Sequence, residues 1–141
     1  MTIKAILAGR DEVISAAPDM AVRDVVALLA ARRIGAVPVM EGGRALGVFS
    51  ERDVITCLAN GDEAALAGPV SAVMTTPAVT VAPDDSVLAA LSLMTRRRIR
   101  HLPVVEDGAV VGIVSIGDLV KYRIDKIEAE ASAMRDYIQS A

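Results

Sequence analysis

The chain has 141 residues, which is the length of one compact domain, and 53% of them are hydrophobic. No apolar run reaches the roughly 18–20 uncharged residues of a membrane-spanning helix, and the apolar stretch near the N-terminus is too short for a secretion signal. The net charge of −3 argues against non-specific binding to nucleic acid or anionic membranes. The single cysteine, Cys57, forms no internal disulfide and is expected to be a small buried residue, which fits a cytoplasmic protein.

The first 60 residues are expected to form a short helix, a strand, a helix, a pair of strands and another helix. Residues 2–8 form the lead-in helix, and residues 13–17 form the first strand. Over residues 21–33 the apolar residues are spaced i, i+3, i+4 and i+7, as in an amphipathic helix. Residues 36–40 and 45–49 are strands of a hairpin that turns at two glycines, because glycine takes positive φ without strain. A helix after Ser50 completes a β-α-β-β-α unit.

The same unit recurs 65 positions later, and residues 14–54 align with residues 79–119 without a gap. Between the copies, residues 60–62 end a helix, residues 63–67 form a helical turn, and residues 70–74 lead into the second copy. A half of about 65 residues is marginally stable alone. We therefore expect an α/β (α+β) fold in which two halves pack against each other. Identical residues recur at Pro18 and Pro83, Ile34 and Ile99, Pro38 and Pro103, Glu41 and Glu106, and Gly43 and Gly108.

The last helix is expected to continue beyond the repeat with a heptad pattern. Its apolar residues are spaced 4, 3, 4, 3 and 4, and charged residues flank them. One interpretation is a helix packed on its own domain, and the other is a helix that meets a second copy of the chain. The regular spacing favours the second interpretation, so we predict a homodimer. The seam comprises Val120, Ile124, Ile127, Ala131, Met134 and Ile138.

Each copy carries the motif Gly-x-x-Ser-x-x-Asp where a strand leads into a helix. One interpretation is a capping box, in which serine and aspartate satisfy backbone amides of the first helical turn. The other is a ligand site: helix amides and serine attract a phosphate, and aspartate accepts hydrogen bonds from ribose hydroxyls, as in dinucleotide-binding folds. Because the motif occurs twice at matching positions, we favour nucleotide binding by Ser50, Asp53, Ser115 and Asp118.

The residue patterns of an enzyme or a metal site are missing from the sequence, which has one histidine and one cysteine. We therefore expect a protein that is not an enzyme. Arg100 and His101 are candidates for phosphate contact, whereas Arg96 and Arg97 are expected to form a solvated helix end. The first copy has Gly35-Ala36 in place of Arg100-His101. We therefore expect its pocket to lack this charge and the two sites to bind ligands unequally.

The two motifs, together with the strands Val37-Pro38-Val39 and Leu102-Pro103-Val104, resemble a tandem pair of cystathionine β-synthase (CBS) domains, a Bateman module. The resemblance covers residues 1 to about 120. It implies a first repeat with its lead-in at 1–66, a second repeat at 67–120 and a helical extension at 121–141. It also implies a pseudo-twofold axis and two clefts between the repeats for AMP, ADP, ATP, NAD(H) or S-adenosylmethionine.

In such modules the motif aspartate binds the ribose hydroxyls and the motif serine contacts phosphate, and dimers form flat discs of four repeats. The resemblance thus implies a stand-alone regulatory protein that needs no cofactor and binds an adenine nucleotide or NAD(H). Any target protein that it regulates would be a separate chain. The alternative is a structural dimerisation module without a small ligand. Strand residues that would line the adenine pockets are Ile14, Ser15, Val79 and Thr80, with Ala36, Val37 and Pro38, and with His101, Leu102 and Pro103.

Overall fold

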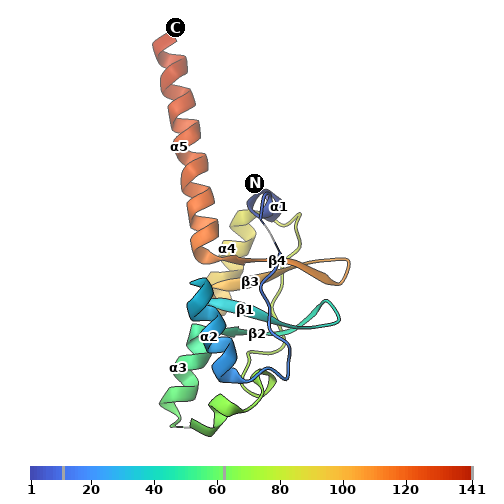
Figure 1. The fold of residues 1–141 in the computed structure, drawn as a ribbon. Coiled ribbons are helices and arrows are strands. Elements are labelled where there is room, and N and C mark those ends of the chain that lie inside the picture. The colour runs from blue at the N-terminus through green and yellow to red at the C-terminus, as the bar shows by residue number, and fades with distance from the viewer. Residues whose placement is uncertain (11, 62, 141) are drawn as a thin grey trace.

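The computed structural model of the chain describes residues 1–10, 12–61 and 63–140. Two β-hairpins lie side by side, and their tips point away from the helices α2, α3 and α5 (Figure 1). The first half contains α1 (Ile3–Leu7), α2 (Val22–Arg32), β1 (Ala36–Glu41), β2 (Arg44–Ser50), α3 (Glu51–Ala59) and the short 3₁₀ helices η1 (Glu63–Ala67) and η2 (Val70–Ala72). The second half contains α4 (Val87–Arg97), β3 (His101–Glu106), β4 (Ala109–Ser115) and α5 (Ile116–Ser140).

The two hairpins are equivalent, as the 65-residue repeat predicts. Ala36 pairs with Ser50 in the first, and His101 pairs with Ser115 in the second. Both turns have two central residues with positive φ, at +59° and +81° for Gly42-Gly43 and at +52° and +80° for Asp107-Gly108. This is the geometry that matches the twist of the flanking strands. The predicted α/β fold with duplicated hairpins and helices is confirmed.

The first strand predicted in each repeat is reduced to a single bridging residue. Ala16 pairs in parallel with Val39, and its counterpart Val81 pairs with Val104. The prediction of a strand over residues 13–17 is therefore wrong in its length. Pro18 and Pro83 follow two residues after the bridging residues, and proline has no amide hydrogen with which to extend the pairing.

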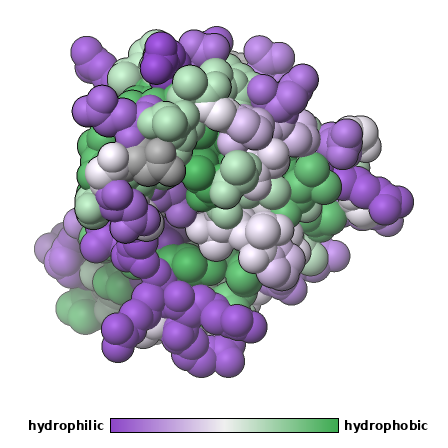
Figure 2. All heavy atoms as spheres, turned by 90° about the horizontal axis from the view of Figure 1, so that it is seen from below, coloured by the Kyte–Doolittle hydropathy of each residue, from purple (hydrophilic) through white to green (hydrophobic). Residues whose placement is uncertain are grey.

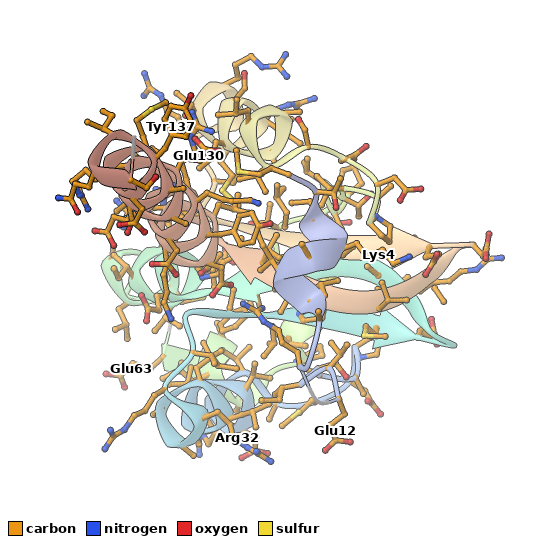
Figure 3. The ribbon with its side chains drawn as sticks, turned by 90° about the horizontal axis from the view of Figure 1, so that it is seen from above. Lys4, Glu12, Arg32, Glu63, Glu130 and Tyr137 are labelled. Atoms are coloured by element: carbon orange, nitrogen blue, oxygen red, sulfur yellow. The ribbon has the colours of Figure 1, made fainter. Side chains whose placement is uncertain are left out.

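Each repeat has its own hydrophobic core, and the segment that precedes a repeat completes the core of the other one. Ile3 of α1 is fully buried in the core of the second repeat, and Val70 of η2 is fully buried in the core of the first. Backbone bonds hold both segments, from Ile3 N to Asp85 O at 3.0 Å and from Val22 N to Gly68 O at 3.0 Å. In Figure 3, α1 with Lys4 lies over the hairpin of β3 and β4. The domain division after residue 66 stays a prediction.

The helix α5 is anchored only at its base. Leu119 is buried there, beside α4 and α1. The later turns stand clear of the other elements that the structure describes (Figure 1). The five large seam residues are 42–65% exposed. The interpretation in which this helix packs along its own domain is therefore wrong, whereas the homodimer stays a prediction.

Candidate functional site

Two clefts lie between the repeats, and each joins the Ser-x-x-Asp corner of one repeat to the helix-to-strand junction of the other. Cleft 1 has a volume of about 440 Å³, and its polar lining includes Ser50, Asp53, Thr75, Arg98, Arg100 and His101. Cleft 2 has a volume of about 630 Å³, and its polar lining includes Arg10, Arg33, His101, Ser115 and Asp118. Both volumes lie within the roughly 300–1,000 Å³ that is typical of small-molecule sites.

The corner of cleft 1 is a capping box at the start of α3. Asp53 Oδ2 accepts hydrogen bonds from the Ser50 amide at 2.9 Å and from Ser50 Oγ at 3.2 Å, and the serine side chain in turn caps the first turn. Asp53 Oδ1 accepts a hydrogen bond from Thr75 Oγ1 at 2.9 Å. A carboxylate has about four acceptor positions. Asp53 is therefore held in a fixed orientation and keeps capacity for a ligand hydroxyl.

The corner of cleft 2 repeats this arrangement with one change. Asp118 Oδ2 accepts from the Ser115 amide at 2.8 Å, and Ser115 Oγ accepts from the Asp118 amide at 3.1 Å. Asp118 Oδ1 pairs with the Arg10 guanidinium at 2.9 Å, where cleft 1 has threonine. Partial burial raises the pKa of Asp118, but the bonds from the Ser115 amide and from Arg10 outweigh this effect and leave the pKa below its usual value. Asp118 is therefore ionised at neutral pH.

Cleft 1 is the more basic of the two. Four arginines line it, against the carboxylates of Glu51 and Asp53. The side chain of Arg52 donates to the backbone oxygen of Arg98 at 2.7 Å and so ties α3 to the end of α4. The exposed Arg97, which we expected to belong to a solvated helix end, also lies on the edge of this cleft. The four arginines are Arg52, Arg97, Arg98 and Arg100.

Cleft 2 contains Gly35 and Ala36, yet it is not devoid of positive charge. Arg10 reaches it from the segment after α1, and Arg33 reaches it from the end of α2. Gly35 takes the place of Arg100 and supplies no charge, as expected, but arginines at other positions of the chain supply positive charge instead. Glu12 and Asp118 balance those two arginines. The two clefts thus differ in net charge, which is strongly positive only in cleft 1.

His101 lies between the clefts and lines both of them, as does Gly35. A Cβ atom on Gly35 would lie 2.9 Å from His101 Nε2, so the imidazole packs directly on the glycine. Burial lowers the pKa of His101 and outweighs the opposing effects of Glu51 and Asp118, while Arg100 lowers the pKa further. The imidazole is therefore neutral at pH 7 and carries a donor and an acceptor nitrogen.

The remaining predicted residues are placed at different depths. Ile14 and Ala36 line cleft 2, and Val79 lines cleft 1. Ser15 and Thr80 are exposed and do not line either cleft. Val37 and Leu102 have no exposed surface and belong to the cores. The buried Pro38 and Pro103 use their carbonyl oxygens to bind the bridging residues, at 3.1 Å to the Ala16 amide and at 3.0 Å to the Val81 amide.

Sequence reasoning missed Arg10 and Thr75. They are 65 positions apart, which is the repeat offset, but both lie outside the aligned ranges 14–54 and 79–119. Extending the alignment by a few residues towards the N-terminus would have paired them. Arginine and threonine are unlike side chains, so the sequence gave no sign that they share a role. The structure shows that each contacts Oδ1 of the motif aspartate in its own cleft.

The part of the chain that the structure describes holds no cluster of three or more residues suited to a metal ion. Among the same residues no helix is both long and apolar enough to cross a membrane. Cys57 is a buried free thiol, as expected.

Comparison with known proteins gives consistent results. The family model of the CBS domain matches residues 3–60 and 70–125. A curated relative, the mitochondrial CBS domain-containing protein CBSX3 of Arabidopsis thaliana, is 35% identical over 126 residues; the match covers 86% of this chain and 61% of that protein. This chain thus spans less than two thirds of the length of that relative.

Solved structures resemble the fold closely. The CBS-domain protein ATU1752 from Agrobacterium tumefaciens superposes with a TM-score of 0.81 at 38% identity, over 87% of this chain and 99% of that one. The CBS domain protein PAE2072 from Pyrobaculum aerophilum, solved in complex with AMP, superposes with a TM-score of 0.75 at 30% identity, over 84% of this chain and 89% of that one. Motif, duplication, fold and family match agree, and this chain belongs to the CBS domain family as a tandem pair of CBS domains.

Proposed function

We propose that the protein is a non-catalytic regulatory module that binds an adenosine-type ligand in the clefts between its repeats. The ligand classes are AMP, ADP, ATP, NAD(H) and S-adenosylmethionine. One observation carries the proposal: cleft 1 combines the oriented carboxylate of Asp53 with several arginines from the opposite repeat. A ribose with its hydroxyls and a negatively charged phosphate need these two kinds of partner side by side.

In this proposal Asp53 accepts hydrogen bonds from the ribose hydroxyls, while Arg98 and Arg100 bind the phosphate. Ser50 is already committed to the first turn of α3 and mainly fixes the corner. The relative PAE2072, which is named as a complex with AMP, supports the choice of ligand class. In cleft 2, Asp118 and Ser115 take the same roles, with Arg10 as a further cation.

Ligand binding regulates such a module by changing how its halves or subunits pack. The arginines of cleft 1 come from both repeats, so a bound phosphate bridges α3 and the junction of α4 with β3. The free energy available for regulation equals the difference in ligand affinity between the two packings. A separate target chain would sense that difference.

The proposal is tested by calorimetry with AMP, ATP, NADH, S-adenosylmethionine and adenosine. We expect AMP to bind, and we expect Asp53→Ala or Asp118→Ala to weaken binding in its own cleft by about 1–3 kcal/mol through loss of charge-assisted hydrogen bonds. Asp84→Ala, at an exposed position outside both clefts, is the matched control. Equal affinity in all three variants would remove these aspartates from the ligand site.

A second candidate function is a structural dimerisation module, and the exposed apolar stripe on α5 favours it. A thermal-shift panel separates the two candidates, because any ligand that binds only the folded state raises the melting temperature. A scaffold without a small ligand would respond to none of the five compounds. Cytoplasmic location stays a prediction in either case.

A further inference from the structure

The exposed seam of α5 is the largest feature that nucleotide binding leaves unexplained. The CBS family match ends at residue 125, whereas α5 continues to Ser140. The five large seam side chains are 42–65% exposed, although a soluble helix normally buries one apolar face. The seam alternates between the two apolar heptad positions, with Ile124, Ala131 and Ile138 at position a and with Val120, Ile127 and Met134 at position d.

The charged residues beside the seam indicate which helix covers it. Arg123 and Glu130 occupy position g, and Lys121, Glu128 and Arg135 occupy position e. In a parallel two-stranded coiled coil, position g of one helix meets position e of the next heptad on the other helix. Arg123 then meets Glu128 of a second copy, and Glu130 meets Arg135. Twofold symmetry repeats both pairs, so every such contact joins opposite charges.

The antiparallel arrangement of the same seam brings like charges together. When the two seams overlap fully, Glu128 faces Glu128 of the other helix and Glu130 faces Glu130. Lys121 then faces Arg135. Like charges across such an interface are unfavourable and suppress the wrong pairing. We propose that α5 forms a parallel two-stranded coiled coil with α5 of a second copy of this chain.

The body of the molecule is compatible with this orientation. A parallel pair puts both bodies at the same end of the coiled coil, beside the base of α5. In Figure 1, α3 lies below that base on the same side of the hairpins. Ile55 and Leu58 of α3 are 65% and 59% exposed, and Figure 2 shows apolar surface among hydrophilic side chains on the lower end of the molecule. Leu58, and Ile55 at the edge where it also lines cleft 1, would extend this interface on to α3.

The first experiment measures mass over a dilution series of the whole chain by analytical ultracentrifugation. We expect a dimer for the unaltered protein and a monomer for Ile124→Asp with Ile127→Asp. The matched control is Ala129→Asp with Ala133→Asp, which adds the same charge to exposed positions of α5 outside the seam. A monomeric unaltered protein, or a control pair that dissociates like the seam pair, would overturn the proposal.

The second experiment tests orientation. Glu128→Arg with Glu130→Arg converts all four parallel contacts to like charges. We expect the dissociation constant of the dimer to rise about tenfold or more at low salt. Adding Arg123→Glu and Arg135→Glu should restore the dimer. In the antiparallel arrangement the first pair of changes only exchanges one like-charge contact for another. An unchanged dissociation constant would therefore overturn the parallel assignment.

A cross-link gives a direct readout. With Cys57→Ala, the only thiol is one introduced at the seam by Met134→Cys, and parallel helices bring this residue next to its own copy. We expect rapid oxidation to a disulfide-linked dimer, with slow oxidation for the outward-facing control Ser132→Cys. Equal rates would contradict the parallel pair. The calorimetric test of ligand binding in the clefts is a separate measurement from these tests of the dimer. Failure of this proposal and failure of the proposed function are therefore distinguishable.

Discussion

Arg10 and Thr75 occupy equivalent places in the two clefts, 65 positions apart in the chain. Thr75 donates to Oδ1 of Asp53 and Arg10 pairs with Oδ1 of Asp118, each at 2.9 Å. The same carboxylate oxygen is thus held by a neutral hydroxyl in cleft 1 and by a cation in cleft 2. The repeat conserves the geometry of the corner while its electrostatics differ.

Arg10→Gln is expected to remove a modest, pH-dependent contribution to stability. Arg10 and Asp118 have side chains that are 39% and 32% exposed, so solvent screening limits their ion pair to about 1 kcal/mol or less. The lowered pKa of Asp118 stabilises the fold above the unfolded-state value, and this stabilisation is lost as the pH falls through the folded-state value. Urea unfolding at a series of pH values from neutral downwards measures the difference, with Arg23→Gln as control. A difference that does not shrink as the pH falls would contradict the ion pair.

Arg100→Gln is expected to reduce affinity for AMP while leaving affinity for adenosine unchanged. The side chain lines cleft 1 and would meet the phosphate, which adenosine lacks. Loss of one charge-assisted hydrogen bond corresponds to roughly tenfold to a hundredfold weaker binding. The control is Arg96→Gln, in the last turn of α4 and outside the cleft. Calorimetry with both ligands decides, and an equal loss for adenosine would place Arg100 away from the phosphate.

The free energy of unfolding is expected to fall between pH 7 and pH 5, in part because of His101. Its pKa is lowered in the folded state, so the unfolded chain binds the proton more readily and protonation favours unfolding. The slope from one such group is at most about 1.4 kcal/mol per pH unit. His101→Gln should make the free energy of unfolding depend less on pH over this range. An identical pH dependence in the variant would show that the imidazole titrates as it does in the unfolded chain.

Gly47→Ala is expected to destabilise the protein more than Gly112→Ala, although the two glycines are equivalent in the repeat. A Cβ on Gly47 would lie 2.6 Å from the backbone oxygen of Thr75. On Gly112 it would lie 2.7 Å from Cδ2 of Leu7, the end of a flexible side chain. Backbone has to shift in the first case, at a cost of about 1–3 kcal/mol. Thermal unfolding of both variants measures the order, and a reversed order would contradict this account.

Much of the fold was readable in the sequence because the repeat compares each element with an independent copy. The two-residue turns at Gly42-Gly43 and Asp107-Gly108 predicted the two hairpins. Ser50 and Ser115, which precede the first turns of α3 and α5, marked the starts of these helices. The crossed packing was not readable, because Ile3 and Val70 look like ordinary apolar residues and their partners are set by tertiary contacts. For the same reason the sequence did not reveal that Arg98 and Arg100 face Asp53 rather than Asp118.

Gly35 and His101 are in contact with each other, and both residues line both clefts. Under the proposed function, a ligand that displaces the imidazole from one cleft would push it towards the other, so binding in the two clefts would be coupled. By thermodynamic reciprocity, the factor by which the first occupant alters the second affinity is also the factor that acts in the reverse direction. Under the proposed function, the contact between His101 and Gly35 would thus allow the duplicated module to respond to two ligands together.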